Sequence, residues 1–127
     1  MRIAIDTNRY VDFAKGAPET VERFRRADEI LVPFVVLGAL RASFAGGART
    51  GENEANLVRF LDSRRVAPVF ADEDTTHHYA QLFRQLRRQG TPIPTNDLWI
   101  AALVVQHELH LFAHDAHFDH LPHIPCL

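Results

Sequence analysis

The sequence has little of several features that define particular classes of protein. Its single cysteine, Cys126, lies next to the end of the 127-residue chain, so no disulfide can form within it. This excludes a disulfide-stabilised secreted scaffold and is typical of a reducing compartment. No apolar run approaches the roughly 20 residues that span a bilayer. The N-terminus also lacks the apolar core and cleavage site of a secretory signal. We therefore expect a cytoplasmic protein without a membrane partner.

An excess of charge of one sign is also missing. The chain has 14 Lys and Arg residues against 16 Asp and Glu residues, which gives a formal net charge of −2. Such a balance provides no general attraction to nucleic acid, so any binding of that kind must come from a local patch. Hydrophobic residues make up 46% of the chain, which is ordinary for a globular protein. The length fits one domain with a real core, residues 1–127.

Short apolar runs predict strands, and the amphipathic segments between them predict helices. Strands are expected at residues 2–6, 29–33, 64–70 and 110–114. Helices are expected at residues 7–16, 18–28, 34–45, 52–63, 72–90 and 97–109, the last after a breaker, "TPIPTN". Strands that alternate with helices in this way predict an α/β fold with a central parallel sheet.

Three aspartates that are far apart in the chain fall where ligands bind in such a fold. Asp6 ends the first predicted strand, Asp115 follows the last one, and Asp97 opens the helix after "PIPTN". In an open parallel sheet, ligands bind beyond the carboxyl ends of the strands, so these side chains are expected to converge. Each also has a simpler interpretation. Asp6 would cap a helix, Asp97 would face a helix dipole, and Asp115 would belong to a turn.

Converging aspartates would constrain the chemistry of the site. Carboxylates a few ångströms apart repel each other, and one of them is driven toward protonation unless a cation joins them. A site with only oxygen ligands favours Mg²⁺, or Mn²⁺ as a substitute, over zinc. Such an ion activates water and stabilises charge on a phosphate oxygen, as the hydrolysis of a phosphodiester requires.

Four segments of the chain occur in an informative order: "IAIDTNRYVDF", "VPFVVLGALRASF", "TPIPTNDLWIAAL" and "HDAHFDHLP". Together they resemble the PIN-domain family, specifically the VapC-type toxins of bacterial toxin–antitoxin pairs. "TNDLWIAA" with a following "D-x-x-F" is the most specific part. The resemblance implies an α/β/α sandwich around the parallel sheet and a Mg²⁺-dependent endoribonuclease that hydrolyses RNA. It also implies a homodimer that is neutralised by a VapB-type antitoxin and meets DNA only through that antitoxin.

The resemblance also assigns roles to particular residues. Asp6, Asp97 and Asp115 take the acidic positions of the catalytic metal site, with Asp119 as a more distant partner. Four neighbouring polar side chains are expected to hold these carboxylates in place: Thr7, Asn8, Thr95 and Asn96. Two arginines near the acidic edge are candidates for contacts with the RNA backbone: Arg9 and Arg41.

One position departs from the family pattern. Residue 39 is alanine, in "GAL", where the family normally has glutamate, in "GEL". Ala39 preserves the helix, because alanine is the best helix former, but it removes a carboxylate that would position or deprotonate the attacking water. We therefore expect this chain to be a weak or inactive nuclease. The retention of the other motifs favours a deliberate substitution over natural decay of the site.

Other readings of the same residues remain open. A catalytically silent PIN-domain module would still bind an antitoxin or RNA, and Ala39 favours that reading. A haloacid-dehalogenase-like phosphatase also has an aspartate after its first strand, but it needs a second acid where this chain has Asn8. The histidines near the C-terminus cross a helix, a strand and a turn, which disfavours one zinc site. Of these, His114 and His117 are expected to be solvated, with contact to a phosphate near Asp115 as the alternative.

Overall fold

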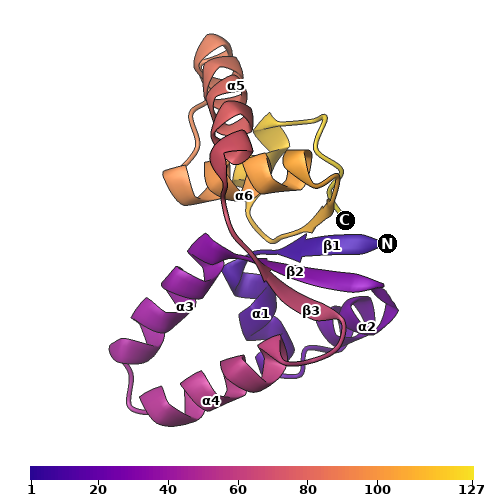
Figure 1. Cartoon of the computed structure of the whole chain (residues 1–127), viewed down its shortest axis with the longest axis vertical. Helices are drawn as coiled ribbons and strands as arrows, with labels where there is room; N and C mark the ends of the chain where they lie inside the picture. The colour runs from indigo at the N-terminus through magenta and orange to yellow at the C-terminus, as the bar shows by residue number, and fades with distance from the viewer.

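A four-stranded parallel sheet runs through the centre of the computed structural model, which describes residues 1–127 (Figure 1). The strands are β1 (Arg2–Ile5), β2 (Glu29–Pro33), β3 (Val66–Val69) and β4 (His110–Phe112). Their order across the sheet is β3-β2-β1-β4, so the last strand returns to pair with the first. The predicted parallel α/β sheet is confirmed. Strand β2 has the expected bounds, and the other three strands are shorter than their apolar runs.

Six α-helices and one 3₁₀ turn surround this sheet. They are α1 (Thr7–Ala14), α2 (Pro18–Arg26), α3 (Phe34–Ala45), α4 (Thr50–Leu61), α5 (Glu73–Gln89), α6 (Thr95–Gln106) and η1 (Ala116–His120). Figure 1 shows α5 and α6 on one side of the sheet and α1, α2 and α4 on the other. This is the three-layer arrangement that the resemblance implies. None of the helices combines the length and the apolar character that a membrane span requires.

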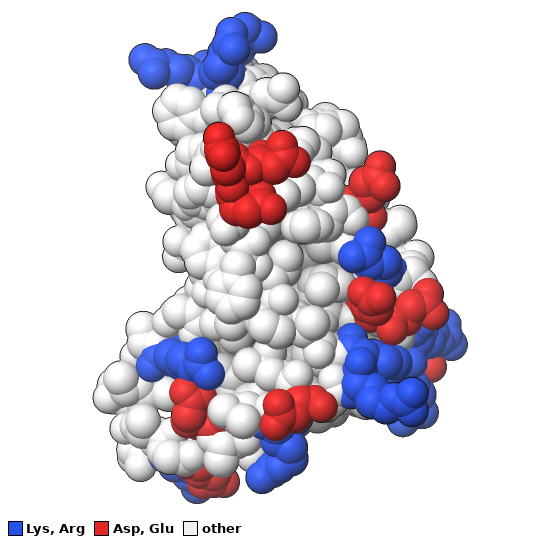
Figure 2. All heavy atoms as spheres, in the orientation of Figure 1, with Lys and Arg blue, Asp and Glu red and all other residues white.

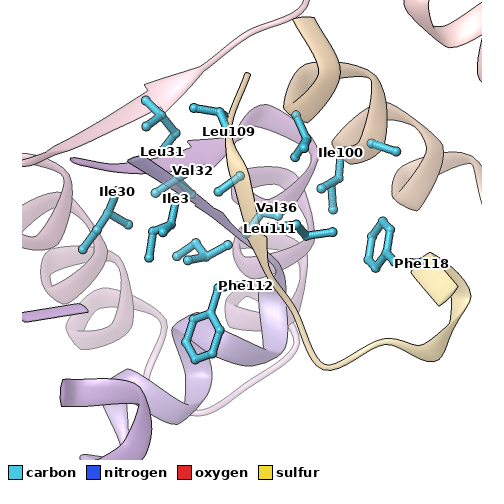
Figure 3. Packing of buried hydrophobic residues seen from close by; sticks show 14 of the residues in the cluster. Ile3, Ile30, Leu31, Val32, Val36, Ile100, Leu109, Leu111, Phe112 and Phe118 are labelled. Carbon is cyan, nitrogen blue, oxygen red and sulfur yellow. The ribbon is translucent and has the colours of Figure 1, made fainter. Parts of the chain in front are cut away.

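Apolar side chains cover both faces of the sheet. Ile3, Ala4 and Ile5 of β1 are fully buried, as expected for a parallel strand between two layers of helices. On one side, the ring of Phe112 packs 6.3 Å from that of Phe24 in α2. Figure 3 shows Ile100 and Phe118 together on the opposite side of β4 from Phe112. These contacts hold the ends of β1 and β4 beside each other and place α6 above them.

The start of α6 differs by two residues from the expectation. The "TPIPTN" segment was expected to be a breaker, but Thr95 and Asn96 are the first two residues of the helix. The breaker ends at Pro94, whose carbonyl accepts a hydrogen bond from the N–H of Leu98 at 3.0 Å. Proline fits immediately before or within the first turn of a helix, because it lacks an N–H group that the turn would leave unpaired. Asp97 consequently lies within the first turn, at the positive end of the helix dipole.

Asp6 is the only carboxylate buried in the chain, with 6% of the residue exposed. It is the N-cap of α1, and its Oδ1 accepts a hydrogen bond from the N–H of Arg9 at 2.9 Å. Its Oδ2 accepts a second hydrogen bond, from the N–H of His114 at 3.0 Å. A buried charge is tolerated when its oxygens are satisfied in this way. One side chain thus joins the end of β1, the first turn of α1 and the loop after β4.

Replacing Asp6 with alanine is expected to lower the free energy of unfolding by about 1–3 kcal/mol, because it removes a helix cap and leaves two N–H groups without an acceptor. Asp6→Asn is expected to lose less, because its amide oxygen still caps α1 and only the bond to the His114 loop is lost. Urea denaturation followed by circular dichroism measures both changes. An Asp6→Ala variant as stable as the unaltered chain would contradict the linking role of this carboxylate.

Candidate active site

A pocket of about 160 Å³ lies where β1 and β4 end. Figure 1 shows that the first turns of α3 and α6 face each other near the end of β1. The lining residues come from these segments and from the loop after β4: Asp6, Thr7, Asn8, Val35, Val36, Ala39, Asn96, Asp97, Ile100 and Asp115. The pocket therefore contains all three aspartates that the sequence analysis selected. It also contains the position at which the sequence departs from the family pattern.

A larger hollow, of about 410 Å³, lies between α1 and α4. No carboxylate and no histidine is among its seven lining residues, four of which are hydrophobic. A cavity of this kind offers no anionic ligand for a hard cation. Of these two pockets, only the smaller one contains carboxylates.

The pKa of Asp97 is raised above its usual value. Burial raises the pKa of Asp97, the negative charges of Asp115 and Asp6 raise it further, and a hydrogen bond from His117 opposes the rise. The same repulsion would be relieved by a divalent cation between the carboxylates. The donor set thus fits an ion that prefers oxygen ligands, such as Mg²⁺ or Mn²⁺. The fold thus contains a group of side chains that could hold a metal ion.

His117 is not one of the lining residues, but its ring lies beside two of them, and with 44% of its side chain exposed it remains solvated as expected. The Nδ1 atom of His117 lies 2.7 Å from Oδ2 of Asp97 and 2.8 Å from Oδ1 of Asp115. The hydrogen bond to Asp97 raises the pKa of His117. One ligand atom from each of these three residues lies within 4.8 Å of the others. Together these three side chains could hold a metal ion.

In the sequence, only the two-residue spacing of Asp115 and His117 could have indicated that the imidazole lies beside the carboxylates. Asp115 is the N-cap of η1, and its Oδ1 accepts a hydrogen bond from the N–H of His117 at 2.9 Å. A cap of this type turns the chain sharply within two residues. The pattern Asp-x-His therefore permits an inward imidazole, but the direction of the ring depends on how η1 packs against α6. Phe118 sets that packing, because it is buried with 2% of the residue exposed.

The polar side chains that were expected to hold the carboxylates do not hydrogen-bond to them. Thr7, Asn8 and Asn96 line the pocket, whereas Thr95 lies outside it. The carboxylates instead accept hydrogen bonds from backbone N–H groups and pair with one imidazole; these partners belong to Arg9, His114 and His117. Backbone N–H groups at two turns thus hold the carboxylates in place, a role that we expected of hydroxyl and amide side chains.

Asp119 lies outside the pocket, on the exposed side of η1. Its charge acts on the thiol of Cys126, whose pKa is raised first by burial and then by Asp119. One 3₁₀ turn repeats every three residues, so a residue four positions after Asp115 does not point in the same direction. Asp119 is therefore placed toward the C-terminal segment and not toward Asp97.

The two candidate arginines are engaged with other parts of the chain. The guanidinium of Arg9 stacks on Phe112, 3.9 Å from the ring centroid, and only 12% of its side chain is exposed. The guanidinium of Arg41 pairs with Glu54 on α4, at 2.7 Å between Nε and Oε1. Neither arginine lines the pocket. Figure 2 shows basic residues in separate groups, one at the tip of α5, with no continuous positive area on that face.

The wall that α3 contributes to the pocket is entirely apolar. It consists of Val35, Val36 and Ala39, and Ile100 of α6 adds a further apolar side chain. Val35 and Ala39 are four residues apart and so share one face of the helix. The acidic groups come only from the ends of β1 and β4 and from α6. Helix α3 therefore supplies neither a base nor a carboxylate to the pocket.

Comparison with known proteins agrees with this architecture. The chain matches the PIN domain family over residues 3–124. It is 28% identical over 115 residues to Ribonuclease VapC1 of Haemophilus influenzae strain R2866, which covers 87% of this chain and 84% of that protein. It is also 28% identical over 93 residues to Ribonuclease VapC4 of Mycobacterium tuberculosis, over 73% of this chain and 72% of that one.

Solved structures share the fold over the full length. The structure of VapBC-1 from nontypeable Haemophilus influenzae has a TM-score of 0.88 at 23% identity, covering 100% of this chain and 97% of that chain. DNA-bound VapBC from Salmonella typhimurium has the same TM-score at 21% identity and the same coverage. Since the family match extends across nearly the whole chain and the fold agrees with it, this chain belongs to the PIN domain family.

Proposed function

We propose that this PIN-domain protein is a VapC-type toxin whose reaction is the metal-dependent hydrolysis of RNA phosphodiester bonds in the cytoplasm. One observation carries the proposal: Asp6, Asp97 and Asp115, from three separate elements, meet in one pocket. The relatives named as VapC ribonucleases support both the reaction and RNA as the substrate.

In this proposal the three aspartates form the catalytic centre. Asp97 and Asp115 hold the cation, and Asp6 adds negative charge while fixing α1 and the loop after β4 through its hydrogen bonds. When bound, Mg²⁺ or Mn²⁺ supplies an activated water and stabilises the charge on the phosphate oxygen. At the edge of the pocket, the exposed amides of Asn8 and Asn96 are placed to hydrogen-bond to the RNA backbone.

We further propose that Ala39 reduces the activity of this chain. The apolar α3 wall has no group to position or deprotonate the attacking water. Even the loss of a partner that only supports a metal ligand typically costs about 10–100-fold in metal affinity or activity. A carboxylate that reaches the pocket itself is expected to matter at least as much.

Restoring the acid at this position tests the proposal. Ala39→Glu is expected to raise cleavage of a mixed RNA substrate by at least about tenfold, because losses at metal sites are of that size. Ala39→Gln is the matched control, since it has the same length without the charge. Cleavage is measured by gel with Mg²⁺ or Mn²⁺, and again with a chelator, which should abolish it.

The same experiment separates the two candidate functions. Adding Asp97→Asn to the Ala39→Glu variant is expected to remove the restored cleavage. If the folded Ala39→Glu variant cuts no RNA with either metal, the silent module becomes the better account. The observation that favours that second function is the apolar wall at Ala39, and its activity would be the binding of an antitoxin or of RNA.

We also propose a VapB-type antitoxin as the protein partner and a homodimer as the assembly of this chain. Structures with the same fold are of VapBC complexes, one of them bound to DNA, and these support the proposal. DNA would then be contacted through the antitoxin, because this chain has a net charge of −2 and its basic residues are dispersed.

The proposed homodimer and its indirect contact with DNA lead to a separate prediction. The purified chain alone is expected to have twice the monomer mass by light scattering after size-exclusion chromatography. It is also expected not to retard a DNA duplex at physiological salt, since its net charge is −2. A monomer at micromolar concentration would contradict the homodimer. Retardation of the duplex by the chain alone would contradict the indirect contact with DNA.

A further inference from the structure

We infer that His117 is a direct ligand of the cation in this pocket and that its imidazole shifts the preference of the site from Mg²⁺ toward Mn²⁺. The inference rests on the proposed function, because it concerns the cation of the same site. It assigns to His117 a role as a metal ligand that the sequence motifs did not predict.

The positions of the three ligand atoms carry the inference. Nδ1 of His117 lies 2.7 Å from an oxygen of Asp97 and 2.8 Å from an oxygen of Asp115. Adjacent ligands of an octahedral ion lie about 3 Å apart, because each metal–ligand distance is about 2.0–2.1 Å. Nδ1 thus lies near this spacing from each of the two carboxylate oxygens, and the three ligand atoms lie within 4.8 Å of one another. A cation can therefore bind among them once the proton on Nδ1 leaves and each group shifts slightly outward.

Asp6 is not part of this tight group. The side chains whose ligand atoms lie within 4.8 Å of one another are those of Asp97, Asp115 and His117. Both oxygens of Asp6 already accept hydrogen bonds from backbone N–H groups, of Arg9 and of His114. Moving Asp6 onto a cation would break or weaken those backbone hydrogen bonds. A cation at His117 replaces only the proton that Nδ1 shares with the two carboxylates, and this proton leaves to solvent. The third protein ligand is thus the imidazole.

The turn η1 holds His117 in place for this role. The N–H of His117 donates to Asp115 at 2.9 Å, and the next residue, Phe118, is buried with 2% exposed. The backbone is therefore anchored on both sides of the imidazole. The ring itself is accessible, because 44% of the His117 side chain is exposed. An ion from solvent can reach it without unfolding the turn.

The ligand chemistry determines the metal preference. Carboxylate and water ligands suit both Mg²⁺ and Mn²⁺, but Mn²⁺, as a first-row transition-metal ion, accepts a nitrogen ligand more readily than Mg²⁺ does. Ala39 strengthens this bias, because it leaves no carboxylate on α3 to complete a set of oxygen ligands. Two aspartates and one imidazole are the donor set that remains.

Pulsed electron paramagnetic resonance of Mn²⁺ added to the full chain tests the inference. A directly bound imidazole produces magnetic coupling between Mn²⁺ and ¹⁴N, which changes when the histidines carry ¹⁵N. We expect this coupling in the unaltered chain and its loss in His117→Gln. His114→Gln is the matched control, since His114 lies on the same loop but its ring contacts Asp12. The control is expected to keep the coupling.

Calorimetric titration provides a second measurement without catalysis. His117→Gln is expected to weaken Mn²⁺ binding by about tenfold or more, a loss of the size seen when metal sites lose a partner. Mg²⁺ binding should change less, so the Mg²⁺-to-Mn²⁺ ratio of dissociation constants falls in His117→Gln. His114→Gln should leave that ratio as it is in the unaltered chain.

The possible outcomes distinguish the role of His117 from the proposed metal site itself. Mn²⁺ that binds without nitrogen coupling, or binds equally well in His117→Gln, would overturn the role of His117 and leave the aspartate site intact. A folded chain that binds no Mn²⁺ would overturn both this inference and the proposed metal site. If His117→Gln does not fold, the isotope effect in the unaltered chain still decides whether a histidine binds the ion.

Discussion

The two hydrogen bonds accepted by the buried Asp6 carboxylate hold together segments that are far apart in the chain. One bond caps α1, and the other reaches His114, 108 residues further along. Asp115 follows His114 directly, so its position depends on the second bond. Asp97 reaches the same pocket because α6 packs over β1 and β4, beside Phe118. The arrangement of the pocket is therefore a consequence of one satisfied charge and the packing around it.

Carboxylates that lie so close together repel one another, and two features of the pocket reduce this repulsion. Burial and the neighbouring carboxylates raise the pKa of Asp97, which shows that the negative charges are not fully compensated there. His117 places a hydrogen-bonding imidazole between two of them. Ala39 removes one further negative charge that the family pattern would add. Alanine at this position also contributes no polar group to the pocket.

Much of the fold followed from local patterns, and so did part of the site. The four strands and six helices were expected in their observed order, since apolar runs and helical periodicity arise from short-range geometry. The convergence of Asp6, Asp97 and Asp115 followed from the rule that parallel strands end at one edge. The extra turn residues of α6 were missed, because "TPIPTN" contains prolines that break a helix when they lie inside it but not when they precede it.

The sequence by itself determined which acids reach one edge of the sheet, because chain direction in a parallel sheet leaves their backbone positions little choice. Only the tertiary structure decided which neighbouring side chains join them. The direction of an imidazole on a short turn depends on what the turn packs against, and beside the buried Phe118 the half-exposed ring of His117 lies against Asp97 and Asp115. Asp119, two residues later, faces Cys126 for the same reason. Arg9 was drawn onto Phe112 by packing with a residue more than one hundred positions away, which no local pattern records.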